Sequence, residues 1–295
     1  MFVVAGLFVG QASAASRGRN GQISFVNNSS GSPQIARINP DGSHRVQLTH
    51  TSTKHWSLFS DWSPNGREIV FDSDRTGAWQ VYTMRADGTD IHKLTHMRGF
   101  SGQASWSPDG SRIVFAHSST GNPPFDLYTV GAEGGPVHRL THSAQFEELP
   151  VYSPDGRWIA FSTFPDTGAP ALHLMRADGS HVHRLTPPRL RASGPEWSPD
   201  GRRIVALANS DRKFSMVFTI RPDGTGIRLI TPKQQAAWPS YSPDGRQIVF
   251  ARLLTGQANS DLWVMNADGS NEHAITHTPN VVESIPDWGT HHLTH

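Results

Sequence analysis

The 295-residue chain contains no cysteine, which excludes disulfide bonds, thiol nucleophiles and cysteine-ligated metals. Its 26 Lys and Arg residues almost balance its 25 Asp and Glu residues. The formal net charge of +1 therefore gives no general attraction to nucleic acid or to an anionic membrane, and we expect neither as a partner. Hydrophobic residues make up only 36% of the chain. Their place is taken largely by turn residues, including 27 Gly and 21 Pro, which indicates an all-β protein with many tight turns.

A short apolar run, FVVAGLFVG, occupies residues 2–10 and is followed by Ala-Ser-Ala. This pattern predicts a signal peptide over residues 1–18 with cleavage near Ala14 or Ala15, although no Lys or Arg precedes the run. A buried N-terminal strand is the alternative. The run is too short to cross a bilayer, and no longer one follows. We therefore expect a periplasmic or secreted protein with no membrane span.

A five-residue motif recurs along the chain at a nearly constant interval. An aromatic residue followed by Ser-Pro-Asp-Gly, or by Ser-Pro-Asn-Gly in the first copy, begins at Trp62, Trp106, Tyr152, Trp197 and Tyr241. These positions are 44 to 46 residues apart. Each copy continues into an apolar triplet, a second apolar run, an Asp-Gly pair in most copies, and a closing Leu-Thr or Ile-Thr. A constant period of this length indicates a repeat architecture.

The repeat has a direct physical interpretation. Pro presets φ and Gly accepts a positive φ, so Ser-Pro-Asp-Gly predicts a tight turn, and the Asp-Gly pair predicts a hairpin. Four antiparallel strands in about 45 residues make one propeller blade, whereas an irregular β-sandwich would not explain the constant period. We expect the repeated Trp and Tyr side chains to pack between blades. We expect the repeated Asp109, Asp155, Asp200 and Asp244 to cap their turns rather than to form a carboxylate ring.

The two ends of the chain complete the blade count. Residues 21–25, 34–38 and 41–49 match the second, third and fourth strands of a blade that has no first strand of its own. The missing strand lies at the other end, because Pro286-Asp-Trp-Gly289 aligns with 195–198. The sequence therefore predicts a six-bladed β-propeller, with four antiparallel strands per blade and a C-terminal strand that completes blade one and closes the ring.

The combination of Trp-Ser-Pro-Asp-Gly, Ile-Val-Phe, Met-x-Ala-Asp-Gly-Ser and Leu-Thr resembles the repeat of TolB-type six-bladed propellers. The resemblance covers about residues 20–290 and divides the chain into a signal peptide (1–18), a propeller (19–290) and a short tail (291–295). TolB carries an α/β domain ahead of its propeller, for which this sequence has no room. The resemblance therefore implies a stand-alone TolB-like propeller.

Sixteen histidines are an unusually large number for a chain of this length. Several form pairs four residues apart in the predicted outer strands, namely His92 and His96, His138 and His142, and His273 and His277. Four residues of a strand span about 13 Å, which is too far for two ligands of one ion. We therefore expect these side chains to lie in solvent at the blade periphery, and we expect no metal and no cofactor.

Positions that differ among the blades are better candidates for function than the repeated turns. The loops from each fourth strand to the next first strand should converge on one mouth of the central channel. The predicted site at this mouth combines aromatic and charged side chains, a composition suited to a peptide or a sugar. It consists of His55, Trp56, Arg98, Phe100, Glu147, Glu148, Arg191, Lys233, Trp238 and Glu283.

Two functions of different classes fit this pattern. We favour a non-catalytic, monomeric binding protein that engages a protein or peptide, because no Gly-x-Ser-x-Gly nucleophile motif is present. The alternative is a propeller enzyme, a lyase or hydrolase acting on a saccharide or lactone. It would use carboxylates such as Glu147, Glu148 and Glu283 with His55 for acid–base chemistry.

Overall fold

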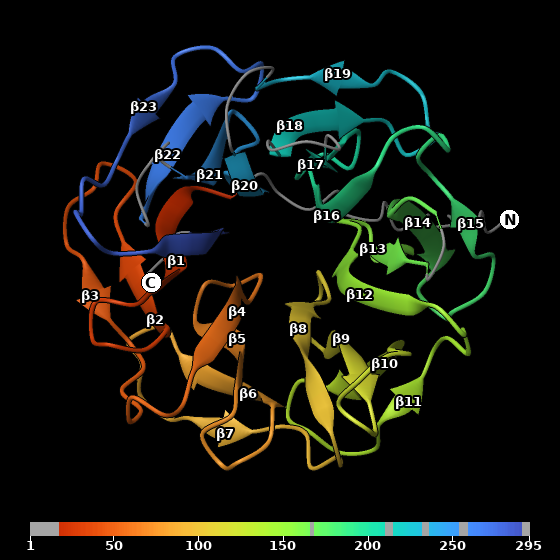
Figure 1. The fold of residues 1–295 in the computed structure, drawn as a ribbon, viewed down its shortest axis with the longest axis horizontal. Coiled ribbons are helices and arrows are strands. Elements are labelled where there is room, and N and C mark those ends of the chain that lie inside the picture. Colours follow the sequence, from red (N-terminus) through yellow and green to blue (C-terminus); the bar gives the residue numbers. More distant parts are fainter. Residues whose placement is uncertain (1–17, 166–167, 210–214, 232–235, 254–258, 291–295) are drawn as a thin grey trace, which may run out of the picture.

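Six four-stranded antiparallel sheets surround a central channel in the computed structural model of the protein (Figure 1). The structure describes residues 18–165, 168–209, 215–231, 236–253 and 259–290, and within these ranges it contains no helix. The predicted all-β, six-bladed propeller is therefore confirmed. The predicted signal peptide, the tail at 291–295 and the mouth residue Lys233 lie outside the described residues.

Each blade is a meander of four strands that runs from the channel to the periphery. The inner strands are β4 (Ser57–Trp62), β8 (Phe100–Trp106), β12 (Phe146–Tyr152), β16 (Ala192–Trp197), β20 (Ala236–Tyr241) and β24 (Glu283–Thr290). The second strands are β1 (Asn20–Asn27), β5 (Glu68–Ser73), β9 (Arg112–Ser118), β13 (Trp158–Phe164), β17 (Ile204–Asn209) and β21 (Gln247–Leu253). The third strands are β2 (Gln34–Ile38), β6 (Gln80–Arg85), β10 (Asp126–Gly131), β14 (Ala171–Arg176), β18 (Ser215–Ile220) and β22 (Ser260–Asn266). The outer strands are β3 (Val46–Gln47), β7 (His92–Lys93), β11 (His138–Arg139), β15 (His183–Arg184), β19 (Arg228–Leu229) and β23 (His273–Ala274).

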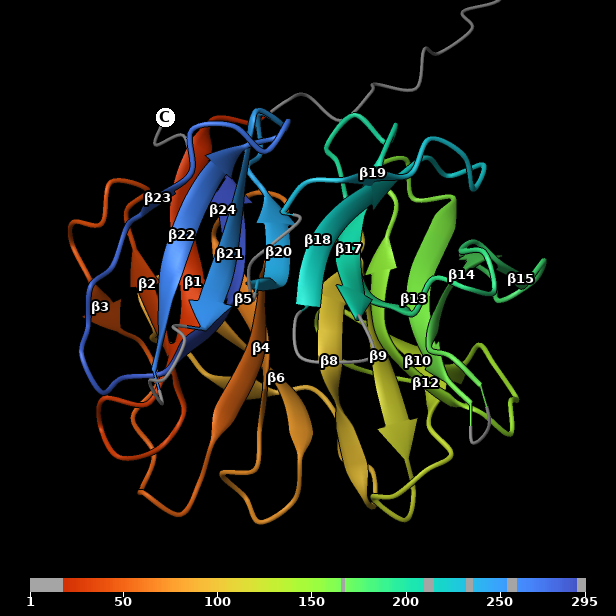
Figure 2. The ribbon, with the colours of Figure 1, turned by 45° about the horizontal axis from the view of Figure 1, so that its top comes forward.

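The ring is closed by strands from the two ends of the chain. The strand order of the first blade is β24-β1-β2-β3, and β24 lies beside β1 in Figure 2. The two strands pair antiparallel, with Ile23 opposite Trp288. The prediction that a C-terminal strand completes the first blade is confirmed. Closure satisfies the backbone of β1, which would otherwise be an open sheet edge.

The repeated turns are held by their own side chains. In the third blade, Asp109 Oδ1 accepts hydrogen bonds from Ser107 Oγ at 2.6 Å and from the backbone N–H of Ser111 at 2.9 Å. Gly110 adopts a φ of 71°, which is the left-handed conformation that glycine tolerates best. The same Ser-to-Asp bond recurs at Asp155, Asp200 and Asp244, so the predicted capping role of these carboxylates is confirmed.

The closing Leu-Thr and Ile-Thr pairs have a structural role that the sequence did not indicate. In all six blades, the Thr hydroxyl accepts a hydrogen bond from a backbone N–H at the beginning of the third strand; in the fourth blade, Leu172 N donates to Thr186 Oγ1 at 3.1 Å. A side chain thus replaces a backbone partner where the outer strand is only two residues long. This bond fastens each short outer strand to its blade.

The hydrophobic core consists of six clusters, each formed between two neighbouring blades. One cluster joins Trp197 of β16 to Ala160 and Leu174 of the preceding blade, and Trp197 is only 6% exposed. The aromatic residue that begins each repeated motif occupies this same position in the other seams. The prediction that these Trp and Tyr side chains pack between blades is confirmed.

The histidines of the outer strands lie at the periphery, as predicted. His92, His138, His183 and His273 are exposed, as are those that follow the closing threonines. Within the described part of the chain, no group of three His, Asp or Glu side chains is arranged to hold a metal ion.

Candidate functional site

All six inner strands contain the same backbone irregularity at the same position. The pairing of each inner strand with its second strand shifts by one residue, which is a β-bulge. The residue at each bulge has a φ between 49° and 64°, although only one of the six is glycine. The bulge residues are Phe59, Gln103, Leu149, Gly194, Trp238 and Ile285. Bulges redirect side chains, and here they turn this ring of residues toward the channel.

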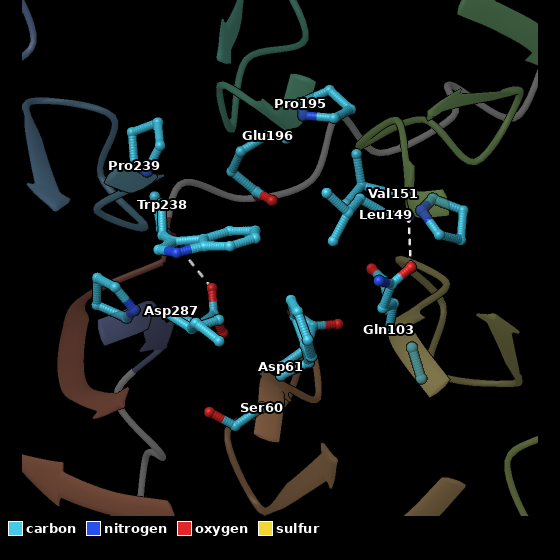
Figure 3. Close-up of a pocket in the computed structure, with 18 residues that line it drawn as sticks. Ser60, Asp61, Gln103, Leu149, Val151, Pro195, Glu196, Trp238, Pro239 and Asp287 are labelled. Carbon is cyan, nitrogen blue, oxygen red and sulfur yellow. Dashed lines mark hydrogen bonds between the residues drawn. The ribbon is translucent and has the colours of Figure 1, made fainter. Parts of the chain in front are cut away.

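The channel is hollowed into a cavity of about 100 Å³, which opens into a wider space of about 590 Å³ that includes solvent. Each inner strand contributes its bulge residue and the two residues after it, so the wall consists of three stacked rings (Figure 3). The first ring is the bulge ring. The second ring contains Ser60, Ala104, Pro150, Pro195, Pro239 and Pro286. The third ring contains Asp61, Ser105, Val151, Glu196, Ser240 and Asp287, and we call it the waist.

The bulge ring forms an apolar and aromatic entrance to this cavity. The rings of Phe59 and Trp238 meet edge to face with their centroids 5.4 Å apart, although they come from the second and sixth blades. Gln103 is the polar member of the ring, and its Oε1 accepts a hydrogen bond from the backbone N–H of Leu149 at 3.2 Å. Aromatic side chains with an available face and edge are effective anchors for a bound group.

The waist carries three carboxyl groups from separate blades. Burial raises the pKa of Asp61 and Glu196 well above the usual range of each residue, and the neighbouring Asp287 raises both further. Burial also raises the pKa of Asp287, and the carboxyls of Asp61 and Asp287 lie within hydrogen-bonding reach of each other. Like charges this close oppose each other's ionisation.

Two of these carboxyls also connect neighbouring blades. Asp287 Oδ2 accepts a hydrogen bond from the backbone N–H of Trp62 at 2.9 Å, and Asp61 Oδ2 accepts one from Trp106 at 2.7 Å. Ser240 Oγ donates to Asp287 Oδ1 at 3.0 Å. These bonds join the backbones of blades one, two and three around the waist and fix where the carboxyls point.

A second cavity opens from the waist toward the face that carries the Ser-Pro-Asp-Gly turns. It shares Asp61, Glu196, Ser240 and Asp287 with the first cavity. Its wall is built mainly from the prolines of the repeated turns and the aromatic residues before them. The waist therefore separates an aromatic entrance on one face from a proline-lined bowl on the other.

The structure describes nine of the ten predicted mouth residues, all but Lys233, and separates these nine into three groups. Trp238 lines the cavity, and Glu148 lies beside it, where its Oε2 accepts a hydrogen bond from Gln103 Nε2 at 3.0 Å. Burial raises the pKa of Glu148. These two are the described members of the predicted set that stand at the channel.

Several others lie on the outer part of the mouth. Trp56 is 46% exposed, and Nδ1 of the adjacent His55 lies 3.5 Å from Asp74. Arg98 is exposed, while Arg191 is partly buried. Phe100 packs edge to face against Phe125, with centroids 5.2 Å apart.

Glu147 and Glu283 are turned away from the channel. Both are buried, and each accepts a hydrogen bond from the closing Thr of the preceding repeat, Thr141 or Thr276. Each lies two positions before a bulge residue, on the side of the strand that faces the seam between blades. In the structure these two carboxylates fasten strands together.

The waist carboxyls were missed because the prediction examined loops rather than strands. A usable signal was present. Alternate residues of a strand face opposite sides, so the residue before each seam-packing aromatic must face the channel. Asp61, Glu196 and Asp287 precede Trp62, Trp197 and Trp288 in the sequence.

The fold and its channel define a six-bladed β-propeller with a side-chain-lined axial cavity. Residues 6–122 and 93–292 match the family model described as the TolB beta propeller domain. The chain therefore belongs to the TolB β-propeller family.

Two solved structures and one curated protein illustrate the relationship. TolB from Acinetobacter baumannii superimposes with a TM-score of 0.79 at 22% identity, covering 91% of this chain and 66% of that one. The putative TolB from Agrobacterium tumefaciens gives a TM-score of 0.69 at 20% identity, covering 90% and 98%. An uncharacterised protein of Agrobacterium fabrum is 34% identical over 61 residues, so the match spans 21% of this chain and only 20% of that relative. At these identities the structural matches show a shared fold.

Helices long and apolar enough to cross a membrane are absent from the part of the chain that the structure describes.

Proposed function

We propose that this protein is an exported, non-catalytic binding propeller that engages a protein or peptide partner at the channel mouth. The observation that carries the proposal is the aromatic entrance formed by Phe59 and Trp238 above the channel cavity. The enclosed part of this cavity has a volume of about 100 Å³, which accepts a side chain but not a folded domain. The bound partner would therefore rest on the mouth and insert no more than a side chain or two into the channel.

The surroundings of the entrance support a peptide as the ligand. Trp56 is 46% exposed at the mouth, so its indole is available to a partner. Exposed Trp, Tyr and Arg side chains are the residues that most often dominate binding energy at protein interfaces. Gln103 and Glu148 add polar groups that can pair with a peptide backbone.

Export is the second part of the proposal. It rests on the apolar run followed by Ala-Ser-Ala at the N-terminus and on membership of the TolB propeller family. The ring is complete within one chain, which supports a monomer. Mass spectrometry of the protein secreted by a bacterial host should find a mature N-terminus near residue 15. A product that keeps residues 1–10 would contradict a cleaved signal peptide.

The test of binding compares three immobilised forms of the protein in an extract of the cell envelope. We expect the wild type to capture a partner that the double variant Trp56→Ala, Trp238→Ala loses by at least tenfold. The matched control is Val182→Ala, which removes an apolar side chain that is 50% exposed on the outer rim of a blade. Unchanged capture by the double variant, or equal loss in the control, would show that the mouth is not the interface.

A further inference from the structure

A separate crevice lies on the face that carries the Ser-Pro-Asp-Gly turns, where the fifth blade (β16–β19) meets the sixth (β20–β23). These two blades are neighbours in Figure 1. The crevice has a volume of about 380 Å³, which is within the range of small-ligand sites, and it shares no described wall residue with the channel cavity. Four arginines line it, namely Arg202, Arg203, Arg228 and Arg246.

Two of these arginines occupy positions that vary among the blades. The residue directly before the apolar triplet of the second strand is Arg203 here and Arg112 in the third blade, and it is not basic in the other four. The first residue of the outer strand is Arg228 here, but His in four blades and Val in the remaining one. All six blades are described at both positions, and only the fifth has arginine at both. Variation of this kind is typical of function rather than architecture.

Both arginines act on the face of the fifth blade that packs against the sixth. Thr219 lies opposite both Val205 and Arg228 in the sheet, and directly opposite residues of antiparallel strands share a face. Val205 belongs to the hydrophobic core between the two blades. Nη1 of Arg203 donates a hydrogen bond to Thr219 Oγ1 at 2.9 Å, which holds its guanidinium group on this same face.

Uncharged acceptors hold the two guanidinium groups in place. Arg203 Nη1 also donates to the carbonyl oxygen of Gly226 at 3.1 Å. Nη2 of Arg228 donates across the seam to the carbonyl oxygen of Asp268 at 3.0 Å. No ion pair among the described residues includes any of the four arginines. The protein therefore orients both groups while it leaves their remaining N–H donors and their charge available to an anion.

Tyr241 is the buried member of the wall. It is only 6% exposed, and no described residue forms a hydrogen bond with its hydroxyl group. Burial raises the pKa of Tyr241 to about 12, and the nearby Arg203 partly opposes this rise. The hydroxyl therefore keeps its proton at neutral pH and is a third donor close to Arg203. A buried tyrosine hydroxyl usually has a partner, which a ligand would supply here.

Three aspartates also line the crevice, namely Asp200, Asp244 and Asp268. One carboxylate oxygen of each accepts hydrogen bonds that hold a tight turn. An adjoining crevice shares Asp244 and Arg246 and adds Arg19, so five arginines face three aspartates. A singly charged carboxylate ligand would gain little from this excess. A phosphate group carries nearly two negative charges at neutral pH, and its oxygens point in several directions, so it can accept from both blades.

We propose that this crevice binds the phosphate group of a phosphorylated ligand, with Arg203, Arg228 and the Tyr241 hydroxyl group as its donors. The site is distinct from the channel mouth and goes beyond the proposed function. The crevice is larger than a free phosphate ion, so the ligand carries its phosphate on a further group. A small phosphomonoester and a lipid headgroup both have this chemistry.

Titration calorimetry with glycerol 3-phosphate is the first test. Glycerol is the uncharged control, and acetate is the carboxylate control. We expect glycerol 3-phosphate to bind at least tenfold more tightly than acetate, and glycerol to give no signal. Equal affinity for acetate, or no binding of glycerol 3-phosphate at about 10 mM, would overturn the proposal.

Variants then locate the site. Arg203→Gln and Arg228→Gln should each weaken glycerol 3-phosphate binding at least fivefold. The matched control is Arg112→Gln, which changes the same position of the third blade, where the outer strand begins with His138 instead of arginine. This control should bind as the wild type does. Unchanged binding by the two folded variants, or an equal loss in the control, would refute the assignment.

Asp268→Asn provides a readout that a loss of structure would not imitate. Asparagine keeps a side-chain oxygen that can accept the turn hydrogen bonds from Ser270, but it removes a negative charge that acts on Arg228. Binding of glycerol 3-phosphate should therefore become about two- to threefold tighter. Unchanged or weaker binding would contradict an electrostatic site.

Vesicle flotation distinguishes the two sources of the phosphate group. If vesicles of phosphatidylglycerol carry the wild type but not Arg228→Gln, the ligand is a lipid headgroup. Binding of glycerol 3-phosphate without flotation assigns the site to a soluble phosphomonoester. Trp238→Ala should leave phosphate binding unchanged. Loss of the mouth partner in that variant with phosphate binding intact would show that the two sites are separate, and loss of phosphate binding would contradict their separation.

Discussion

Two consecutive residues of the same inner strand have opposite roles in this molecule. The aromatic residue of each motif faces the seam between blades and is nearly the same in all six: Trp62, Trp106, Tyr152, Trp197, Tyr241 and Trp288. The residue directly before it faces the channel and varies among four residue types: Asp61, Ser105, Val151, Glu196, Ser240 and Asp287. The seam repeats because every blade packs in the same way. The waist lies outside this repeated packing, so its side chains are free to vary from blade to blade.

The difference teaches where stability and binding reside. Removing a seam residue should lower the stability of the fold, whereas neutralising the waist residue Glu196, which accepts no described hydrogen bond, should raise it. The predictions below test that contrast, beginning with the largest expected effect.

Trp197→Ala should lower the free energy of unfolding by about 3–5 kcal/mol, because it empties a large volume between two blades. Thermal and urea denaturation measure the loss. Trp56→Ala provides the matched control, since Trp56 is 46% exposed and its removal should change the melting temperature little. Similar losses for both variants would show that burial in the seam is not what makes Trp197 important.

Gly289→Ala should destabilise the closing blade by about 2–3 kcal/mol. A Cβ at this position would lie 2.4 Å from the indole ring of Trp62, and both residues are buried. Urea denaturation of the single and double variants tests the contact. Trp62→Phe should cost less in the Gly289→Ala background than alone, because the smaller ring relieves the collision. Strict additivity would contradict this explanation.

Thr186→Val should cost about 1–2 kcal/mol by leaving the backbone N–H of Leu172 without its acceptor. The two side chains have nearly the same shape, so the change removes the hydrogen bond and little packing. Hydrogen exchange should show faster exchange of the Leu172 amide and of neighbouring amides in β15. Uniform exchange rates in the variant and the wild type would show that the outer strand is fastened by other contacts.

Glu196→Gln should stabilise the protein, with a rise in melting temperature on the order of 2 °C at pH 8. Burial raises the pKa of this carboxyl, so the folded state binds its proton more tightly than the unfolded chain does. The stability contributed by protonated Glu196 is complete below the ordinary pKa of glutamate and is lost as the pH rises through the raised value. The advantage of the variant should therefore be absent at pH 4 and grow toward pH 8. A constant difference across this range, or any loss at pH 8, would contradict the pKa direction.

The fold was predictable because the same turn and the same packing residue recur in each blade. Four copies of Ser-Pro-Asp-Gly and one of Ser-Pro-Asn-Gly showed the blade period, and Trp288 near the C-terminus revealed the missing inner strand. Residues that repeat report architecture, so the turn-capping role of Asp109 and the seam position of Trp197 followed from counting. No comparable repetition pointed to the bulges, because their residues share a conformation and not a side chain.

The candidate site was less predictable for a geometrical reason. Glu147 and Glu148 are consecutive, yet one is buried in a seam and the other stands beside the channel. A one-residue bulge decides which of the two faces inward, and bulges leave little trace in a sequence when the residue involved is Leu149 rather than glycine. Loop positions could be assigned to the mouth, and the waist could have been found from the residues before the seam aromatics, but the bulge ring required the structure.

The pairing of β24 with β1 joins two strands that are synthesised at very different times. A ribosome adds about 5–20 residues per second, so β1 emerges roughly 15–50 seconds before the strand that completes its sheet. Throughout that interval Val26 and its neighbours present an unpaired edge, which invites pairing with another nascent chain. A propeller whose ring is closed by β24 is therefore an open arc until its synthesis is complete. Its yield in a cell depends on what protects the unpaired edge of β1 until β24 has been made.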